Sequence, residues 1–398
     1  MARRLAIPSE DVQLRIVGPA NVMKVARVQR VTINNDIPTT DIFELGNSSL
    51  AGIAQDTPNV TVTFSVFDVG IRAFSVMTGT DWAAYPAAGV DISELGEADV
   101  ILDIRDTDAD VFIKTAHGKR LQVRDFTFTY SVDGESTEDY TLIGSEKRWF
   151  KHEVIVDRFV SGTTSFALSQ TPIQLKNGND LLSVILDGEY LEEVTAGPGT
   201  GEYEVTGTTL TTGDTRTAQV LAIYHAIPGG TTWVDVDDDV QPAAVRGRDV
   251  DITIAANGIP RVQSVTINGN LNVQPVREMG SRVVTGYQKQ VSTVEGTITV
   301  LDTDTELISL FTDGTLSGAG VSEFSSEDIC PTSGISLKIE ITDPCDTTLP
   351  LTVLKTVYLD EITMVGESYT SNVNNNAQQT FNFKSITAHC VVYSGVGP

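Results

Sequence analysis

The sequence is poor in the residues on which metal-binding and catalytic sites most often depend. Its 398 residues include three cysteines and four histidines. Cys330, Cys345 and Cys390 are too few and too widely spaced for a disulfide scaffold. None of the histidines has a cysteine or carboxylate neighbour at a recognised metal-ligand spacing, and no hydrolase nucleophile motif occurs. We therefore predict a chain that is not an enzyme and that holds no metal or cofactor.

Basic residues and long apolar runs are scarce as well. Lys and Arg number 27 against 53 Asp and Glu, which gives a formal net charge of −26. A surface this negative repels phosphate backbones, although solubility or a saline habitat would explain the charge equally well. No run approaches the length of a membrane span, and the start MARRLAIPSEDVQL lacks the apolar segment of a signal peptide. We expect folding in the cytoplasm, with reduced thiols and no membrane contact.

Two clusters resemble ligand-binding loops but are incomplete. The aspartates at 106, 108 and 110 are spaced like the start of a calcium loop, but glycine is missing at its sixth position. His117 also stands where the bidentate glutamate is needed. The glycines at 197, 199 and 201 precede a predicted strand, whereas a dinucleotide loop precedes a helix. Surface turns are the favoured interpretation of both.

One feature occurs twice. RVQRVTINN at 27–35 returns as RVQSVTING at 261–269, an offset of 234 residues. Without a gap, residues 27–78 align with 261–312, and 16 of these 52 positions are identical. With short gaps the similarity extends further, to Asp11 and Val12 with Asp249 and Val250, Asp106 with Asp343, Lys119 with Lys355, Thr127 with Thr363, and Thr141 with Thr380. A repeat of this length exceeds a solenoid unit and matches the size of a domain, which predicts a duplicated domain.

The apolar residues alternate with period two, which is typical of strands with one buried face. Segment 60–68 places Val60, Val62, Phe64 and Val66 on one side, and segment 294–302 does the same with Val294, Ile298 and Val300. Further matched strands are expected at 99–106 and 335–343, and at 121–132 and 357–365.

A short helix is predicted after the second strong strand of each copy. Ala73, Val76 and Met77 have helical spacing in the first copy. Leu307, Leu310 and Phe311 have it in the second, behind a possible capping box of Thr303 and Glu306. The fold class predicted is mainly β: two homologous antiparallel β-sandwich or barrel domains, each with one short helix.

A long connection, 34–59 or 268–293, follows the first strand of each copy. Connections of this length inside a compact domain are generally functional. An apolar residue before glycine indicates a tip that packs against another molecule, and the alternative is an extension folded on its own domain. The candidate positions are Phe43, Glu44, Leu45, Gly46, Arg277, Glu278, Met279 and Gly280.

The middle region has no copy elsewhere in the chain. Segment 181–226 alternates strands with Asp-Gly, Gly-Pro-Gly and Thr-Gly-Asp turns, as a small immunoglobulin-like β-sandwich does. The predicted domains are therefore 1–154, the insert 155–242, and 243–398. The polar, turn-rich linkers at 160–165 and 235–249 predict few contacts between the insert and the two copies.

The RVQSVTING strand, the long loop with its FELG or REMG element, the VTVTF strand and the short helix together resemble the tail tube (major tail) proteins of tailed viruses. The resemblance implies that the inner sheets of six domains join into a ring, that rings stack into a hollow tube, and that the long loop reaches a neighbouring ring. A chain with two copies would build a trimeric, pseudo-hexameric ring from three chains.

The resemblance also implies partners and a location. The partners are further copies of the chain, the tape-measure protein, and the tail-terminator and distal-tail proteins. Double-stranded viral DNA would pass through the acidic lumen without specific binding. The insert would decorate the outside, which favours a non-contractile, siphovirus-like tail. The chain would be assembled in the host cytoplasm and end in the virion tail. The alternatives are a distal-tail or terminator ring of the same fold lineage, and a β-sandwich surface adhesin.

Overall fold

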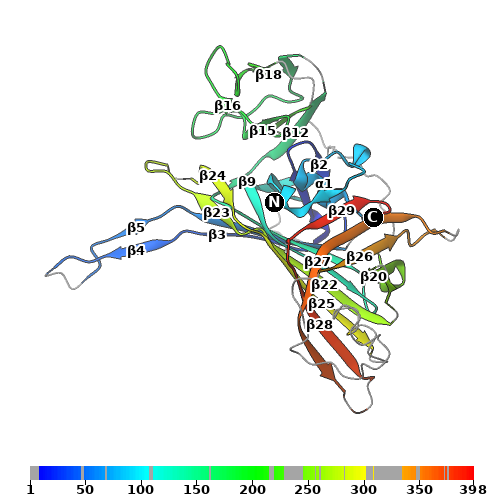
Figure 1. Cartoon of the computed structure of the whole chain (residues 1–398). Coiled ribbons are helices and arrows are strands. Elements are labelled where there is room, and N and C mark those ends of the chain that lie inside the picture. The colour runs from blue at the N-terminus through cyan, green and yellow to red at the C-terminus, as the bar shows by residue number, and fades with distance from the viewer. Residues whose placement is uncertain are drawn as a thin grey trace, which may run out of the picture.

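The computed structural model shows a mainly β chain built from antiparallel sheets, with β16 and β17 as a parallel pair (Figure 1). A β-sandwich class fits this architecture. The structure describes residues 9–301, 308 and 334–398, apart from gaps at 46–48, 68–69, 107–110, 161–162, 215–218, 228–244, 256, 260, 282, 347–349, 372 and 374–375.

A single 17-stranded sheet contains two sets of strands from the two ends of the chain. The first set is β1 (Val12–Val17), β2 (Val22–Lys24), β3 (Val28–Asp36), β6 (Asn59–Phe67), β7 (Val90–Asp91), β8 (Glu97–Asp106), β9 (Val111–Ser131), β10 (Thr137–Gly144) and β11 (Glu146–Phe150). The second set is β20 (Val250–Ile254), β21 (Asn257–Gly258), β22 (Val262–Asn270), β25 (Thr293–Leu301), β26 (Ile335–Thr342), β27 (Val353–Thr370), β28 (Gln378–Ser385) and β29 (Cys390–Ser394).

The two sets have the same pairings. In the first set β1 pairs with β2 and β8, β8 with β9, β9 with β10 and β11, β10 with β6, and β6 with β3. In the second set β20 pairs with β21 and β26, β26 with β27, β27 with β28 and β29, β28 with β25, and β25 with β22. Each strand of one set except β7 (Val90–Asp91) therefore has an equivalent in the other among the described residues.

The repeated RVQ sequence has a local structural role. Arg27 and Arg261 both have positive φ, 54° and 65°, which bends the chain into the strand that follows. The amide nitrogen of Gln29 donates to the Arg27 carbonyl at 3.0 Å, and that of Gln263 donates to the Arg261 carbonyl at 3.3 Å. The same residues recur because the same turn, with the same side-chain hydrogen bond, opens both strands.

Strand register agrees with the ungapped alignment and with the gapped matches of Val12 to Val250 and Asp106 to Asp343. It corrects three of the gapped matches. β3 pairs with β6, and β22 with β25, through positions that differ by 234 throughout. The later pairings of β9 and β27 differ by 241, as Leu121 opposite Ala98 and Ile362 opposite Ile335 show. Those three gapped matches were therefore wrong, because insertions in the connecting loops shifted them: Lys119 corresponds to Asp360, Thr127 to Ser368, and Thr141 to Asn382.

The predicted strands and their buried faces are confirmed. All seven side chains predicted to point inward from β6 and β25 are buried. They join an apolar cluster that runs through both sets of strands, with Phe126, Phe128, Phe381 and Phe383 among its largest members. α1 (Arg72–Thr78) buries Ala73, Val76 and Met77 as expected and ends at Gly79 in the left-handed conformation.

The second predicted helix lies outside the described residues apart from Ile308, which is helical. Short 3-10 turns occur in the described part of the chain at Ser9–Asp11, Trp82–Ala84, Ile92–Glu94 and Gly247–Asp249.

Each long connection forms a two-stranded hairpin. β4 (Thr39–Ile42) pairs with β5 (Gly52–Gln55), and β23 (Val273–Val276) pairs with β24 (Gly286–Lys289). Their registers again differ by 234, because Thr39 faces Gln55 and Val273 faces Lys289. The β4–β5 hairpin projects far from the body, whereas β23–β24 stays close to β9 (Figure 1).

The middle region forms two four-stranded sheets around a core of its own. One sheet is ordered β12-β19-β14-β15 and the other β13-β18-β17-β16. β12 begins two residues before the expected boundary at 155. The strands are β12 (Glu153–Val160), β13 (Ser165–Ala167), β14 (Ser183–Leu186), β15 (Glu189–Tyr190), β16 (Glu192–Glu193), β17 (Glu202–Thr206), β18 (Thr209–Thr212) and β19 (Gln219–Ala226).

Candidate assembly interface

The two sets of strands are joined edge to edge. β22 pairs antiparallel with the last part of β9, from Ser264 opposite Ser131 to Asn270 opposite Asp125. We call this pairing the β9–β22 seam. On one face of the seam Thr127 donates from its hydroxyl to Asn268 Oδ1 at 2.9 Å. On the other face Phe128 and Ile267 lie opposite each other and are fully buried.

A buried ion pair also crosses between the sets. Lys355 on β27 donates to Glu138 on β10, with 0% and 2% of their side chains exposed. The Tyr140 hydroxyl donates to the other oxygen of Glu138 at 2.5 Å, and the Lys355 ammonium lies 4.8 Å from the centre of the Phe128 ring. Such a pair is stable only if both charges stay partnered, so it fixes how the sets meet.

A third contact lies on the outer side of the joined sheet. β29 pairs with β7 through Val391 opposite Asp91 and Val392 opposite Val90. The Tyr85 hydroxyl donates to the Val392 carbonyl at 2.9 Å. The two sets are therefore held together by strand pairing on two sides as well as by the ion pair.

The equivalents of β22 and of the last part of β9 are β3 and the last part of β27, and each has a strand edge without a partner among the described strands. Among the strands that the structure describes, β3 pairs with β6 only, and Gly366–Thr370 of β27 pairs with β28 only. Ile33 is half-buried although its equivalent Ile267 is fully buried. Tyr369 is 60% exposed although its equivalent Phe128 is fully buried. Both strands therefore expose side chains whose equivalents are buried in the seam. An uncovered strand edge is a template for pairing with another strand.

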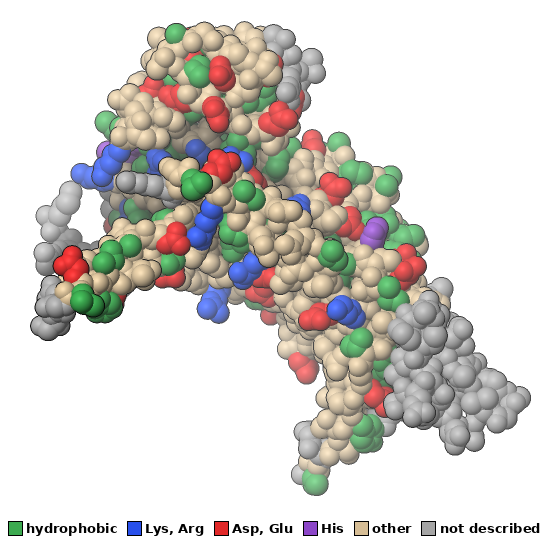
Figure 2. All heavy atoms as spheres, turned by 60° about the vertical axis from the view of Figure 1, so that its left-hand side comes forward, with side chains coloured by type: hydrophobic (Ala, Val, Ile, Leu, Met, Phe, Trp, Pro, Cys, Tyr) green, Lys and Arg blue, Asp and Glu red, His purple; other side chains and the backbone are tan. Residues whose placement is uncertain are grey.

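The predicted tip residues lie at the ends of the two hairpins. Phe43 and Leu45 are 74% and 108% exposed, and Met279 is 105% exposed. Ile37, Ile42, Leu50 and Ile53 add to an apolar surface along β4–β5, which Figure 2 shows on the projecting arm. Exposed apolar residues in such a group mark an interaction surface.

The other tip positions are polar or glycine. Glu44 and Glu278 are exposed, and Gly280 has a φ of 91° that favours glycine. Arg277 pairs with Asp56 at 3.2 Å, which links the two hairpins to each other. Gly46 lies outside the described residues.

One side of the second hairpin, formed by β24 and the residues just before it, lies on the first set of strands. The Val284 amide donates to the Ser145 hydroxyl at 2.8 Å, and the Lys289 ammonium donates to the Ser93 carbonyl at 2.7 Å. Burial lowers the pKa of Lys289 and raises the pKa of Tyr287. The hairpin therefore contacts the adjacent set through its β24 side, whereas Gln274, Pro275 and Val276 of β23 and the tip are exposed.

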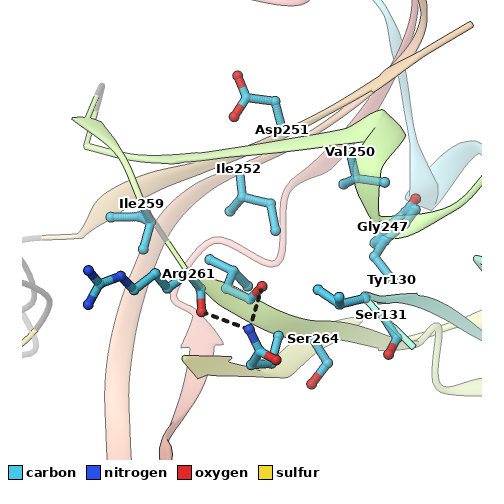
Figure 3. Close-up of a pocket in the computed structure, with 12 residues that line it drawn as sticks. Tyr130, Ser131, Gly247, Val250, Asp251, Ile252, Ile259, Arg261 and Ser264 are labelled. Atoms are coloured by element: carbon cyan, nitrogen blue, oxygen red, sulfur yellow. Dashed lines mark hydrogen bonds between the residues drawn. The ribbon is translucent and has the colours of Figure 1, made fainter. Parts of the chain in front are cut away.

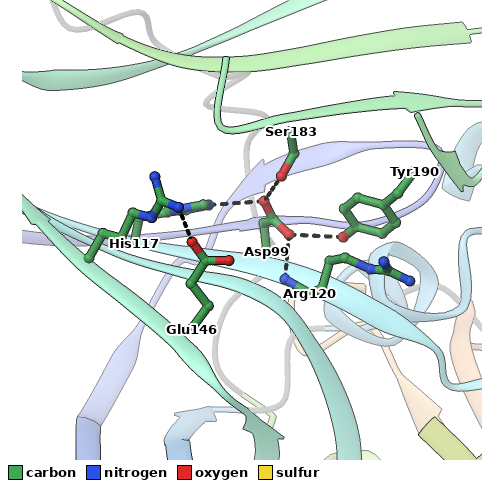
Figure 4. Close-up of polar contacts among 7 residues, drawn as sticks. Asp99, His117, Arg120, Glu146, Ser183 and Tyr190 are labelled. Atoms are coloured by element: carbon green, nitrogen blue, oxygen red, sulfur yellow. Dashed lines mark hydrogen bonds and ion pairs between the residues drawn. The ribbon is translucent and has the colours of Figure 1, made fainter. Parts of the chain in front are cut away.

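The insert is clamped to the first set by one buried carboxylate. Asp99 on β8 accepts four hydrogen bonds (Figure 4). His117 Nε2 lies 2.9 Å from Asp99 Oδ2, and the Arg120 amide donates to Oδ1 at 2.8 Å. From the insert, the Ser183 and Tyr190 hydroxyls each donate at 2.9 Å. The Arg120 guanidinium also lies over the Tyr190 ring at 4.8 Å.

An apolar core supports the same contact. It is shared between the first set and the insert, and consists of Val17, Val22 and Ile101 packed against Val154, Val156, Leu175, Leu182, Ile185, Leu221 and Ile223. Arg15 bonds Asp103 at 2.6 Å and the Val154 carbonyl at 2.6 Å. The expectation of few contacts between the insert and the copies was wrong. One face of β8 packs on the core of the first set. The opposite face, which is usually polar when it faces solvent, carries Ile101 and is buried by the insert.

The clamp has a defined charge state. Burial would raise the pKa of Asp99, but the hydrogen bond and charge of His117 and the Arg120 amide outweigh burial and hold that pKa below its ordinary value. Burial raises the pKa of Tyr190 well above 10.0, so its hydroxyl remains a donor. Asp99 is therefore an acceptor and Tyr190 a donor near neutral pH.

A cleft lies beside one end of the seam, between the end of β9, β20 and the start of β22 (Figure 3). Its volume is about 180 Å³, and Tyr130, Ile252, Ile259, Arg261 and Gln263 line it. Ligand pockets usually measure about 300–1,000 Å³. The Gln263 side-chain amide in this cleft is hydrogen-bonded to the Arg261 carbonyl in the turn before β22.

Nothing matches this chain among protein-family models or among curated proteins. Within the described residues no group of three or more His, Cys, Asp or Glu side chains is arranged to hold a metal ion. In the same part of the chain, no helix is long and apolar enough to cross a membrane.

Proposed function

We propose that this chain is a structural virion protein that polymerises into the tail tube of a tailed virus, with three chains in each pseudo-hexameric ring. The observation that carries the proposal is the β9–β22 seam, through which two equivalent sets of strands already share one sheet. Each chain has one open edge of each kind, so this contact can repeat from chain to chain. In the proposed ring, three repeats of its rotation return to the first chain.

The proposal includes the domain organisation expected from the sequence. The two sets of strands are two copies of one domain, supported by their shared pairings and the shared offset of 234 in four strands and two hairpin registers. The middle region is an immunoglobulin-like insert. Two copies that occupy equivalent places in a ring must keep the same edges, which accounts for the near identity of β3 and β22.

The face of the joined sheet opposite the core is the proposed lumen. It carries hydroxyl and amide side chains from several strands, including Thr61, Thr63, Thr127, Thr129, Thr266, Asn268, Thr297, Thr299 and Thr380. Its carboxylates include Asp125 and Glu295, of which Asp125 pairs with Arg124 and Glu295 faces Lys384. Such a wall offers a passing DNA duplex few cations to bind, consistent with a conduit.

The insert and the hairpin tips take the remaining roles. The insert packs on β1 and β8, away from the proposed lumen, and decorates the outside of the tube. A covered outer surface favours a non-contractile tail. The exposed tips at Phe43, Leu45 and Met279 contact the next ring. The tape-measure, tail-terminator and distal-tail proteins are the other partners, and assembly takes place in the host cytoplasm.

Electron microscopy of the purified full-length chain tests this function. We expect tubes, or rings with near-sixfold density and three chains by native mass. A chain that stays monomeric at high concentration would argue against a tube protein, and rings of six chains would contradict the pseudo-hexamer. A single terminal ring per virion would favour the distal-tail or terminator alternative.

A further inference from the structure

The intrachain seam specifies, residue by residue, how one chain would meet the next. We propose that β3 of one copy of the chain pairs antiparallel with the C-terminal part of β27 of another, with Asn34 opposite Ser368. This inference rests on the proposed function in assuming that the two sets of strands occupy equivalent places. It goes further by fixing the edges, the register and the side chains in contact.

The register follows from the two offsets. Positions in β22 and β3 differ by 234, and positions in β9 and β27 differ by 241. Asn268 opposite Thr127 therefore becomes Asn34 opposite Ser368. By the same offsets Ile33 lies opposite Tyr369, and Thr32 lies opposite Thr370.

The chemistry of the seam is kept at these positions. An asparagine meets a hydroxyl in both cases, so the 2.9 Å bond between Thr127 and Asn268 has a counterpart between Ser368 and Asn34. An isoleucine meets an aromatic ring in both cases. Pairing would cover Ile33 and the 60% exposed Tyr369, as the seam covers Ile267 and Phe128. Burial of these side chains from both partners is the driving force.

Residues of opposite charge also stand at the place between chains that corresponds to the buried ion pair. Lys355 corresponds to Lys114, and Glu138 corresponds to Gln379, which donates to the Glu367 carboxylate at 2.9 Å. Lys114 is half-buried and lies 4.7 Å from the centre of the Trp149 ring. In the assembled pair, Lys114 of one chain lies against Tyr369 and Glu367 of the next, as Lys355 lies against Phe128 and Glu138.

The first hairpin completes this interface. In the chain, Val284 just before β24 and Tyr287 on β24 lie at Ser145 and Gly144, at the end of β10. The equivalent residues are Leu50 and Ile53 on β4–β5, and Ile386 just after β28. Ile53 and Ile386 are 56% and 50% exposed. The β5 side of the first hairpin therefore lies on the second set of the neighbouring chain in the same ring.

A cysteine pair tests the register on the full chain. In a background with Cys330→Ser and Cys345→Ser, Asn34→Cys and Ser368→Cys are combined and mildly oxidised. Cys390 is buried and is kept. We expect covalent dimers and trimers on a non-reducing gel, because directly opposed side chains on one face of a sheet approach within disulfide range.

Two matched pairs serve as controls. Thr127→Cys with Asn268→Cys should form an intrachain crosslink, which shows that the geometry permits a disulfide. Asn34→Cys with Tyr369→Cys places the thiols on opposite faces and should stay uncrosslinked. Monomer from the test pair, while the intrachain control crosslinks, would overturn the register.

The outcome separates this inference from the proposed function. Tubes seen by microscopy without the crosslink would leave the function standing and reject the pairing of β3 with β27. Crosslinked multimers without tubes would support the pairing and reject the tube. A second pair needs no cysteine: Lys114→Glu and Glu367→Lys should each lower the sedimenting fraction several-fold, and together restore it. Failure of the combined variant to recover, with native circular dichroism, would count against the interface.

Discussion

Lys355 and Glu138 form a fully buried ion pair, although 217 residues separate them in the chain. The pair lies where the two sets of strands meet, and Tyr140 and the Phe128 ring complete its surroundings. A buried charge that loses its partner is costly, whereas a pair neutralised on both sides is tolerated. The intact pair therefore adds little net stability, whereas the loss of either partner alone is costly.

We predict that Lys355→Met lowers the free energy of unfolding by about 3–5 kcal/mol, because it leaves the Glu138 carboxylate buried and uncompensated. Adding Glu138→Gln should recover most of the loss, since the amide still accepts from Tyr140. Urea denaturation of the two variants measures both values. Equal destabilisation of the single and double variants would show that the charge is not the cause.

Lys355 also shows what sequence analysis could have found. It falls in phase with the buried Val357 and Leu359, so the alternation itself indicated a buried lysine. Its partner could not be predicted, because Glu138 is far away in sequence. The alignment by identity misled further, matching Lys355 to Lys119 where strand register gives Lys114.

Asp99 gives a second prediction at the clamp between the first set and the insert. Asp99→Asn removes the charge that accepts four hydrogen bonds, and bonds to charged groups contribute about 1.5–3 kcal/mol each. We expect Asp99→Asn to accelerate amide hydrogen exchange more in β14 and β15 than in β22 and β25. Ser183→Ala, which removes one bond only, should give a smaller change in the same strands. Uniform acceleration across all strands would contradict a local clamp.

The same carboxylate predicts a pH dependence. The pKa of Asp99 in the folded chain lies below its ordinary value of 3.8, so the folded state holds fewer protons there than the unfolded state. Its stabilisation is fully present above that ordinary value and is lost as the pH falls through the folded value. Unfolding midpoints measured from about pH 7 to about pH 2 should fall more steeply for the native chain than for Asp99→Asn. Parallel curves would show that Asp99 does not supply the acid-sensitive stability.

The hairpin tips give a prediction that leaves the fold unchanged. Phe43→Ser combined with Leu45→Ser alters side chains that are 74% and 108% exposed, so we expect an unfolding midpoint close to that of the native chain. Tube length by microscopy should fall sharply while single rings persist. Ile227→Ser, at an exposed apolar residue of the insert, is the matched control and should leave tube length unchanged. Normal tubes from the tip variant would mean that the tips do not contact the next ring.

The alternation predicted the strands well because one face of each is buried and the other polar. It predicted the strand β8 but not that both of its faces are buried, as Ala98, Val100 and Ile101 are. The second face of β8 is covered by the insert, a contact with no local signature in the sequence. The long connections were predicted to be functional, which stays a prediction, and their hairpin form depends on pairing across as many as 16 positions, such as Thr39 with Gln55.

Removing the insert gives the last prediction, and the second set of strands supplies its control. Joining residue 152 to residue 245 with a short Gly/Ser linker deletes the insert and exposes Ile101 and Asp99, which the insert covers. At the equivalent positions the second set, which carries no insert, has Lys338 and Ser336. Lys338 pairs there with Glu340 at the surface, so this face is already suited to solvent.

We therefore expect the simple deletion to aggregate, and the deletion with Ile101→Lys and Asp99→Ser to remain soluble and form tubes of unchanged inner and smaller outer diameter. Size-exclusion chromatography and microscopy measure the two outcomes. A soluble simple deletion would show that the apolar contact with the insert is dispensable. Failure of the substituted deletion to form tubes, with both sets of strands still folded by circular dichroism, would place the insert in the tube wall and reject its outward position.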